Sequence, residues 1–313
     1  LYRADRGYQI DLLGDAPLVG VVVAQGDIVP GEQAQGMVGA TTTAHLLRQA
    51  REDEQIHAVV LRVDSPGGDA YASEVIRREV EGLQQAGKPV VVSMGDVAAS
   101  GGYWISMDAS EIWAQPTTIT GSIGIYGLFV TIPQTLEKLG IHVDGVGTTP
   151  IAGAFDIRRP LDPRVESVWA SVTEKGYRNF IGKVAAARGK TPEQIDAIAQ
   201  GRVWSGAQAK QRGLVDKLGG LEDAITSAAA RADIAGNYRT RYVERELSGW
   251  ERIALSFSNS ASARAMTKWS GIDALLPNLP AVAELRSAVD LLNTLAGNRF
   301  GVVAHCFCGL SQH

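Results

Sequence analysis

Asp96-Val-Ala-Ala-Ser100-Gly-Gly-Tyr103 and Asp64-Ser-Pro-Gly-Gly68 are the two stretches that decide the fold. Each of them follows a short apolar run rich in β-branched residues, Pro89–Ser93 in the first case and Ala58–Val63 in the second. Such runs, bounded by glycine and proline, are typical of buried strands. Because α/β folds place their sites at strand ends, we expect the two glycine-rich turns to lie side by side at one edge of a sheet.

Strand and helix patterns alternate along the first half of the chain, and this alternation predicts an α/β core with a largely parallel sheet. The predicted strands are Leu18–Val29, Ala58–Val63, Val90–Ser93, Glu111–Ala114, Thr120–Tyr126 (interrupted by glycine) and Ile141–Val146. The predicted helices are Thr42–Glu52, Ala72–Ala86, a short one from Ser100 through Met107, and Ile132–Leu139.

The character of the chain changes after Pro160, where helix-start signals follow one another. Asp162-Pro163 and Thr191-Pro-Glu-Gln194 each combine a capping residue with a proline in the first turn. We therefore expect a single domain over 1–236, with an α/β core to about 160 and a helical part over 161–236. A C-terminal extension, 237–313, should follow, with a short strand at Tyr238–Val243 and an amphipathic helix at Ala281–Leu295.

Composition excludes several classes of protein. The 313 residues are 45% hydrophobic and 20% charged, with a formal net charge of −4, which gives no reason to expect a nucleic-acid partner. No apolar segment is long enough to span a bilayer. The chain begins at Leu1 rather than Met, so we expect it to continue a longer polypeptide whose N-terminal segment carries an anchor or signal.

The two cysteines, Cys306 and Cys308, are too few for a disulfide framework. A C-x-C pair alone is a poor zinc site, although His305 and His313 leave a metal site in the tail as an alternative to a purely structural tail. The glycine-rich segments match neither the phosphate loop nor the dinucleotide fingerprint. We expect no metal and no cofactor.

Ser100 is the candidate nucleophile. A serine hydroxyl at a turn from strand to helix is exposed to substrate, and Gly101 and Gly102 would let a substrate backbone come close. Backbone N–H groups of Gly67, Gly68 and Gly101 could form an oxyanion hole. The alternatives are an ordinary helix cap at Ser100 and a plain Pro-Gly turn.

The base that such a serine needs is missing from the pattern. His45, His57 and His142 are each explained by packing or by a surface position. A lysine base must have its pKa lowered by burial or by nearby charge, and no lysine here has an obviously apolar context. A long amphipathic helix is predicted from Asp162-Pro163 to about Arg188, and Lys175 and Lys183 fall on it and form a solvated face.

The chain resembles the signal peptide peptidase A family, also called protease IV, which has the ClpP/crotonase fold and uses a Ser–Lys dyad. Four segments, spread over about Leu18 to Ala232, carry this resemblance through their order and spacing. They are Asp64-Ser-Pro-Gly-Gly68, Val97-Ala-Ala-Ser100-Gly-Gly-Tyr103, Thr120-Gly-Ser-Ile-Gly-Ile-Tyr126, and Gly201-Arg-Val-Trp-Ser-Gly206 with Gly213-Leu-Val-Asp216.

The resemblance implies roles for four residues. Ser100 falls on the nucleophile, Ser122 on the serine that positions the lysine amine, and Gly68 and Gly101 on the oxyanion hole. In the short family members the lysine lies in a segment whose equivalent here is Val146-Gly-Thr-Thr-Pro-Ile151, so that Pro150 takes its place. This chain therefore lacks the lysine of the dyad.

Long family members explain this departure, because their first half supplies the lysine and their second half the serine. The chain resembles the second half, so it should be inactive alone and should need the N-terminal half of the same polypeptide. The resemblance further implies a homo-oligomer, a tetramer, anchored in the bacterial inner membrane with its catalytic part facing the periplasm. The expected substrates are cleaved signal peptides and other apolar peptides.

Two other functions remain open at this point. One is a crotonase-type acyl-CoA enzyme, which would use the same oxyanion hole on a thioester but would have no role for Ser100. The other is a catalytically incomplete scaffold or assembly half, which the absent lysine favours.

Overall fold

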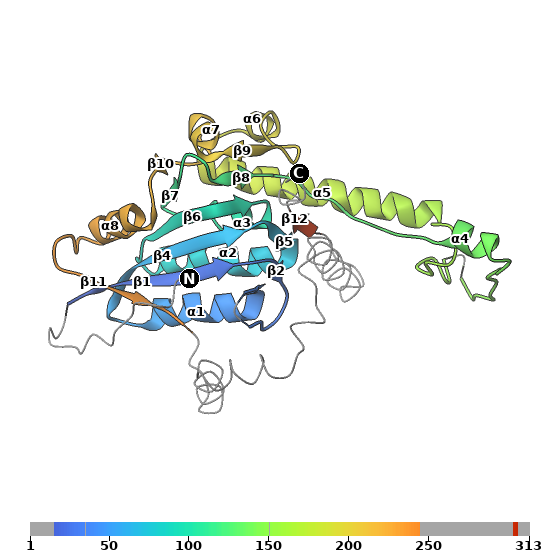
Figure 1. Cartoon of the computed structure of the whole chain (residues 1–313), viewed down its shortest axis with the longest axis horizontal. Helices are drawn as coiled ribbons and strands as arrows, with labels where there is room; N and C mark the ends of the chain where they lie inside the picture. The colour runs from blue at the N-terminus through green and yellow to red at the C-terminus, as the bar shows by residue number, and fades with distance from the viewer. Residues whose placement is uncertain (1–15, 35, 150, 245–302, 306–313) are drawn as a thin grey trace, which may run out of the picture. The chain divides into compact units, whose positions relative to one another are not determined.

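A mostly parallel sheet forms the centre of the structure, a computed structural model that describes residues 16–34, 36–149, 151–244 and 303–305 (Figure 1). Its strands lie in the order β10-β7-β6-β4-β1-β11, with β8 and β9 continuing from β6. Every pairing in this sheet is parallel except the one between β8 and β9. The strands are β1 (Leu18–Gln25), β4 (Ile56–Ser65), β6 (Val90–Ala99), β7 (Glu111–Ala114), β8 (Ile119–Gly121), β9 (Val203–Ser205), β10 (Lys217–Leu218) and β11 (Arg239–Tyr242).

Both faces of this sheet are buried, which explains why its strands read as continuous apolar runs. On β4, Val59 and Leu61 belong to the core on one face, whereas Ala58 and Val60 belong to the core on the other. Helices α1 (Ala40–Glu52) and α2 (Ala70–Gln85) contribute to the first core, and α8 (Leu221–Arg231) to the second. The structure confirms the α/β fold class and the largely parallel sheet predicted from the sequence.

The helical part also packs against the first core. Helix α5 (Pro163–Arg188) inserts Phe180, Ile181 and Val184 into it. Asp162 caps this helix by accepting from the N–H of Arg164, as the Asp-Pro signal predicts. Three shorter helices belong to the same body: α3 (Gly101–Trp104), α6 (Pro192–Asp196) and α7 (Gly206–Gln211).

A second, small sheet runs in the order β12-β5-β2-β3. Its members are β2 (Ile28–Val29), β3 (Val38–Gly39), β5 (Gly67–Asp69) and β12 (Val303–His305). The single strand predicted over Leu18–Val29 is thus two strands, divided at Gly26, whose φ of 101° turns the chain. The glycine pair predicted as a turn contributes the short strand β5.

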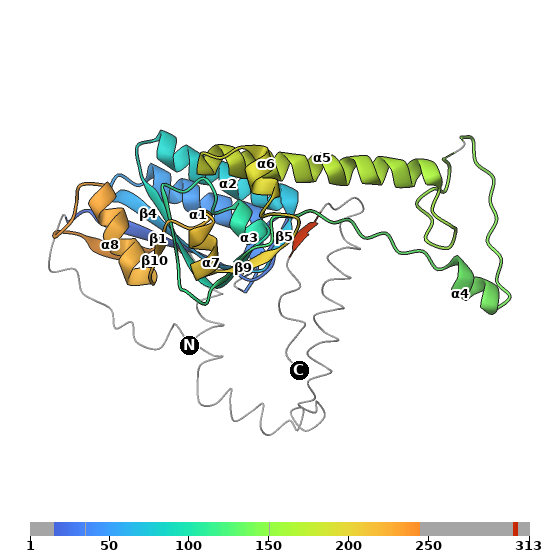
Figure 2. The ribbon, with the colours of Figure 1, turned by 90° about the horizontal axis from the view of Figure 1, so that it is seen from above.

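The prediction of a strand at Ile141–Val146 is wrong. These residues belong to a segment, 127–162, that we call the arm; it carries helix α4 (Pro133–Lys138) and lies beyond the end of the sheet in both views (Figures 1 and 2). None of the strands in the described residues pairs with this segment, and Ile141 and Val146 are 49% and 106% exposed. The predicted helix Ala281–Leu295 lies outside the described residues.

Within the described ranges, no helix is both long and apolar enough to cross a membrane. The same part of the chain holds no group of three His, Cys, Asp or Glu side chains that could bind a metal ion.

Candidate active site

Ser100 occupies a strained turn between β6 and α3. Its φ of 54° and ψ of −112° lie outside the regions that a residue with a side chain normally adopts. Such strain persists only where the surroundings enforce it, and it concentrates at functional sites. A serine held on a sharp strand-to-helix turn is the arrangement that presents a nucleophile in many hydrolases. The residue is 1% exposed.

Hydrogen bonds on both sides hold this turn. The N–H of Ser100 donates to the carbonyl of Gly121 on β8 at 2.8 Å, and the Ser100 carbonyl accepts from Trp104 at 2.9 Å. Gly102 packs so closely on β4 that a Cβ there would lie 2.6 Å from the Ser65 carbonyl oxygen. Glycine is therefore required at this position if the turn is to sit on the sheet.

The two predicted oxyanion-hole glycines lie next to each other. A Cβ placed on Gly101 would be 3.1 Å from the backbone nitrogen of Gly68 and 2.7 Å from Ser73 Oγ. At Gly68, φ is 151° and a Cβ would collide with the carbonyl oxygen of Ile28. Side chains are thus excluded from both positions, and two backbones that are 33 residues apart in the sequence meet beside Ser100.

Ser122 directly follows the neighbouring strand β8, as Ser100 directly follows β6. The register of β6 and β8 pairs Ala99 with Gly121, so the residues that follow each of them are adjacent. Ser122 also has a positive φ, 49°, and its N–H donates to the Arg202 carbonyl at 2.8 Å. The structure therefore brings together all four of the predicted site residues at one edge of the sheet.

The segment Gly201–Gly206 packs against β8 and holds it in place, a role that was not predicted from the sequence. Strand β9 pairs antiparallel with β8, Val203 opposite Gly121. Trp204 packs on Gly121, where a Cβ would be 2.9 Å from its ring, and its Nε1 donates to the Ile198 carbonyl. A tryptophan between two glycines in a polar stretch was the available signal.

Asp64 and Asp69, which flank the glycine turn, both have structural partners. Asp64 Oδ1 accepts from the N–H of Val97, which ties the end of β4 to β6. Asp69 caps α2 by accepting from Ala72 at 2.6 Å. Burial raises the pKa of Asp69, against the backbone N–H groups of Ala72 and Tyr71, which favour its charged form.

Two side chains of α3, the short helix after Ser100, anchor it by hydrogen bonds to other elements. Tyr103 is fully buried and donates to the Leu214 carbonyl at 2.9 Å, which explains the part played by the Gly213–Asp216 motif. Trp104 Nε1 donates to Glu74 at 3.0 Å. Burial alone would raise the pKa of Glu74, but hydrogen bonds from Arg77, Trp104 and Arg78 outweigh it and lower that pKa to about 2.

Three lysines of the described residues bind groups other than Ser100. No hydrogen bond joins a basic side chain to the Ser100 hydroxyl within this part of the chain. Lys183 pairs with Glu74 at 3.2 Å, Lys88 donates to backbone carbonyls at the end of α1, and Lys217 pairs with Glu111. Pro150, at the position where the resemblance places a lysine, lies outside the described residues.

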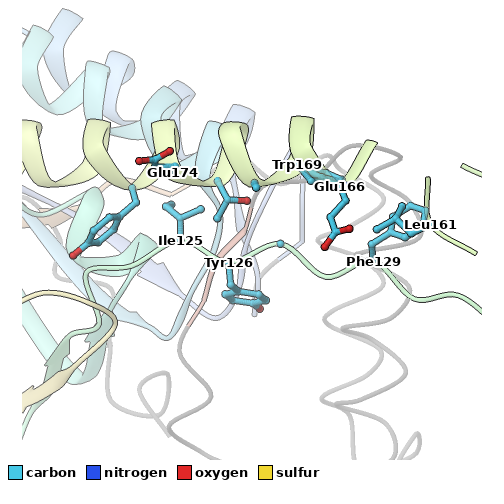
Figure 3. A pocket seen from close by; sticks show the side chains of 11 residues that line it. Ile125, Tyr126, Phe129, Leu161, Glu166, Trp169 and Glu174 are labelled. Atoms are coloured by element: carbon cyan, nitrogen blue, oxygen red, sulfur yellow. The ribbon is translucent and has the colours of Figure 1, made fainter. Parts of the chain in front are cut away.

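An open groove of about 630 Å³ begins three residues beyond Ser122 in the chain. It lies between the extended segment that follows β8 and helix α5 (Figure 3). Apolar and aromatic side chains provide most of its lining, with two carboxylates on the α5 side. The lining includes Ile125, Tyr126, Phe129, Leu161, Glu166, Trp169, Glu174 and Tyr177.

Comparison with known proteins gives consistent results. The model of Peptidase family S49 matches residues 82–235. Protease 4 of Salmonella typhi is 46% identical over 88% of the chain, but the chain spans only 44% of that protein's length. A putative protease of Methanocaldococcus jannaschii is 32% identical, and the match covers 78% of the chain and 79% of that protein.

Among solved structures, a mutant of ClpP1 from Listeria monocytogenes matches 66% of this chain and 94% of its own, with 17% identity and a TM-score of 0.43. The sequence relatives carry the assignment, because their matches extend over most of the chain. The chain belongs to Peptidase family S49, the family of protease 4 and signal peptide peptidase A.

Proposed function

We propose that this chain is the serine-bearing half of an endopeptidase in which Ser100 is the nucleophile. The observation that carries the proposal is the strained backbone of Ser100 beside two glycines, Gly68 and Gly101, at which side chains are excluded. A site of this kind brings a hydroxyl and backbone N–H groups together around the position of one carbonyl group. A nucleophile and an oxyanion hole are the groups that acyl transfer requires.

The proposed reaction has two stages. A neutral lysine amine takes the proton from the Ser100 hydroxyl as its oxygen bonds to the peptide carbonyl carbon, and the N–H groups of Gly68 and Gly101 stabilise the oxyanion. Collapse breaks the C–N bond, and the ammonium returns its proton to the leaving amine. Water, deprotonated by the same amine, then attacks the acyl-enzyme and releases Ser100.

The lysine comes from a part of the polypeptide outside this chain. Two observations support this: the chain spans less than half the length of the Salmonella relative, and Lys183 and Lys217 are paired with carboxylates instead of Ser100. Ser122, adjacent to Ser100 across β6 and β8, would position the incoming amine. We further propose a homo-oligomer, a tetramer, anchored in the bacterial inner membrane with the site facing the periplasm.

Cleaved signal peptides and other apolar peptides are the proposed substrates. The groove between the segment after β8 and α5 supports this choice, because its lining is largely apolar and aromatic and its volume is that of a ligand pocket. An apolar peptide segment would bury its side chains there.

The test is Ser100→Ala in the full-length protein, assayed on an apolar signal peptide. Loss of the nucleophile should lower kcat by about 10⁴-fold or more, while the thermal midpoint stays close to that of the parent. Ser171→Ala, on the exposed surface of α5, is the matched control and should keep full activity. Turnover retained in Ser100→Ala would rule out the assignment of the nucleophile.

A further inference from the structure

The groove between the segment after β8 and helix α5 is apolar along most of its length but carries charge of one sign only. Its lining includes two carboxylates, Glu166 and Glu174, and none of the described residues that line it is basic. An apolar wall with carboxylates on one side is complementary to a ligand that is both apolar and positively charged. The groove therefore favours one kind of peptide over apolar peptides in general.

The two carboxylates differ in what they already bind. Glu174 forms an ion pair with Arg178, one turn further along α5. Glu166, in contrast, takes part in none of the ion pairs among the described residues, and the arginine two positions before it, Arg164, pairs with Asp162. Glu166 is thus the carboxylate of the groove whose charge a ligand can still neutralise.

The side chain of Glu166 points into the groove beside aromatic residues. In Figure 3 its carboxylate reaches from α5 toward the extended segment, close to Phe129, and Trp169 follows three residues later on the helix. A cation that lies over an aromatic ring gains free energy in addition to its attraction to a carboxylate. This end of the groove therefore offers the surroundings that suit a lysine or arginine side chain.

The charged end of the groove lies at a defined distance from Ser100. Ser122 is adjacent to Ser100 across β6 and β8, and Phe129 follows Ser122 by seven residues along the extended segment. At about 3.3 Å per residue, these residues cover about 23 Å. An extended peptide that lies along this segment, with its scissile bond at Ser100, would bring a side chain about seven residues away to the level of Glu166.

We propose that Glu166 is a specificity-determining residue that binds a lysine or arginine of the substrate, about seven residues on the N-terminal side of the scissile bond. The proposal rests on the proposed function, because it concerns which peptides the same groove selects. Signal peptides have the matching composition, since a positively charged segment precedes their apolar segment. The groove binds the junction of these two segments, and a purely apolar peptide binds it less tightly.

The experiment measures the preference of the full-length protein between two peptides. They share an apolar sequence and differ at one position, about seven residues before the scissile bond, where one has lysine and the other has uncharged, unbranched methionine. The enzymes compared are the parent, Glu166→Gln and a control, Glu222→Gln. Glu222, like Glu166, is an exposed acidic residue in the first turn of its helix, but it belongs to α8, which does not line the groove.

The parent should favour the lysine peptide about threefold to fivefold in kcat/KM, the effect expected of one partly exposed ion pair. Glu166→Gln should lose this preference, and Glu222→Gln should keep it. The preference should also disappear when the salt concentration rises from about 0.01 M to about 1 M, where the Debye length is only about 3 Å. A preference that survives in Glu166→Gln or at high salt would overturn the proposal, and so would equal kcat/KM values of the parent for the two peptides.

Binding measurements separate this proposal from the proposed function. The dissociation constants of the two peptides are measured with Ser100→Ala, with and without Glu166→Gln, because this background should not hydrolyse them. A preference for the lysine peptide that Glu166→Gln removes, in a full-length protein that hydrolyses neither peptide, would support the role of Glu166 and overturn the peptidase function. Hydrolysis of both peptides with equal kcat/KM would support the peptidase function and overturn the role of Glu166.

Discussion

The glycine-rich edge around Ser100 and the arm at 127–162 differ in how much of their side-chain surface the rest of the chain buries. At the edge, Ser100 and Ser122 are 1% and 6% exposed, and neighbouring strands fix their backbones with hydrogen bonds of 2.8 Å. The arm holds most of the large apolar side chains that the described residues leave exposed. Those in the arm are Leu128, Val130, Leu139, Ile141, Val146, Ile151, Phe155 and Ile157.

This difference separates a site that the fold of the chain builds by itself from a segment whose apolar side chains the described residues leave uncovered. A site formed by strain and close backbone approach must be built by the fold itself. Contiguous exposed apolar surface, in contrast, marks an interaction site. The arm agrees with the proposed association of this chain with further subunits or with the remainder of its polypeptide.

The largest effect on folding is expected at the edge, from Gly68→Ala. The new Cβ would collide with the Ile28 carbonyl oxygen at a φ of 151°, so the free energy of unfolding should fall by about 3 kcal/mol or more. Gly182→Ala on α5 is the control: no atom lies within 4 Å of its Cβ, and a gain of up to about 1 kcal/mol is expected. Denaturant unfolding measures both. Equal stability of the two variants would refute the close approach of β5 and β2.

A smaller decrease in the free energy of unfolding is expected from Glu74→Gln, which weakens the hydrogen bond that Trp104 of α3 donates to this side chain. The pKa of Glu74 is lowered from 4.5 to about 2 in the folded protein, so its charged form contributes stability above pH 4.5 that is lost as the pH falls through 2. At pH 7 the variant should be destabilised by about 2–3 kcal/mol.

The difference between parent and variant should shrink when unfolding is measured from pH 5 down to pH 2. Glu81→Gln on the same helix is the control, because that side chain is 48% exposed and its pairing with Arg77 should contribute less than about 1 kcal/mol. A stability difference for Glu74→Gln that does not depend on pH would contradict the ion-pair account.

The smallest effect on folding is expected in the arm. Val146→Lys replaces a fully exposed apolar side chain, so the free energy of unfolding should change by less than about 0.5 kcal/mol. Association, measured by sedimentation velocity of the full-length protein, should weaken. Gln134→Lys adds the same charge to the arm without removing apolar surface, and it should leave association intact. Unchanged association in Val146→Lys would remove this residue from the interface.

The sequence predicted those parts of the fold that rest on local patterns. Apolar runs located β4, β6 and β7, and capping signals located α5 and α6. The prediction of a strand at Ile141–Val146 failed because an apolar pattern does not show which segment will pair with it, and none of the described strands pairs with the arm. The positive φ of Ser100 depends on contacts with β8, which no local pattern records.

The glycines of the candidate site could be predicted from the sequence, because only glycine fits where two backbones come close together. Gly68 and Gly101 are glycines because backbone atoms from distant segments approach them, and the motifs retained that constraint in the sequence. The contact partners of Trp204 and Tyr103 could not be predicted, because each contact joins distant segments, although the tryptophan between two glycines was a signal that its segment matters. The strand β12 was unpredictable as well, since its partner lies more than 230 residues away.

The central claim is that Ser100 needs a lysine supplied from outside this chain. The most direct test measures peptidase activity on an apolar signal peptide for this chain alone and after addition of the remaining N-terminal half of the polypeptide. We predict no turnover by the chain alone and turnover when both parts are present, abolished by Ser100→Ala. Turnover by the chain alone, or none from a folded complex of both parts, would contradict the account.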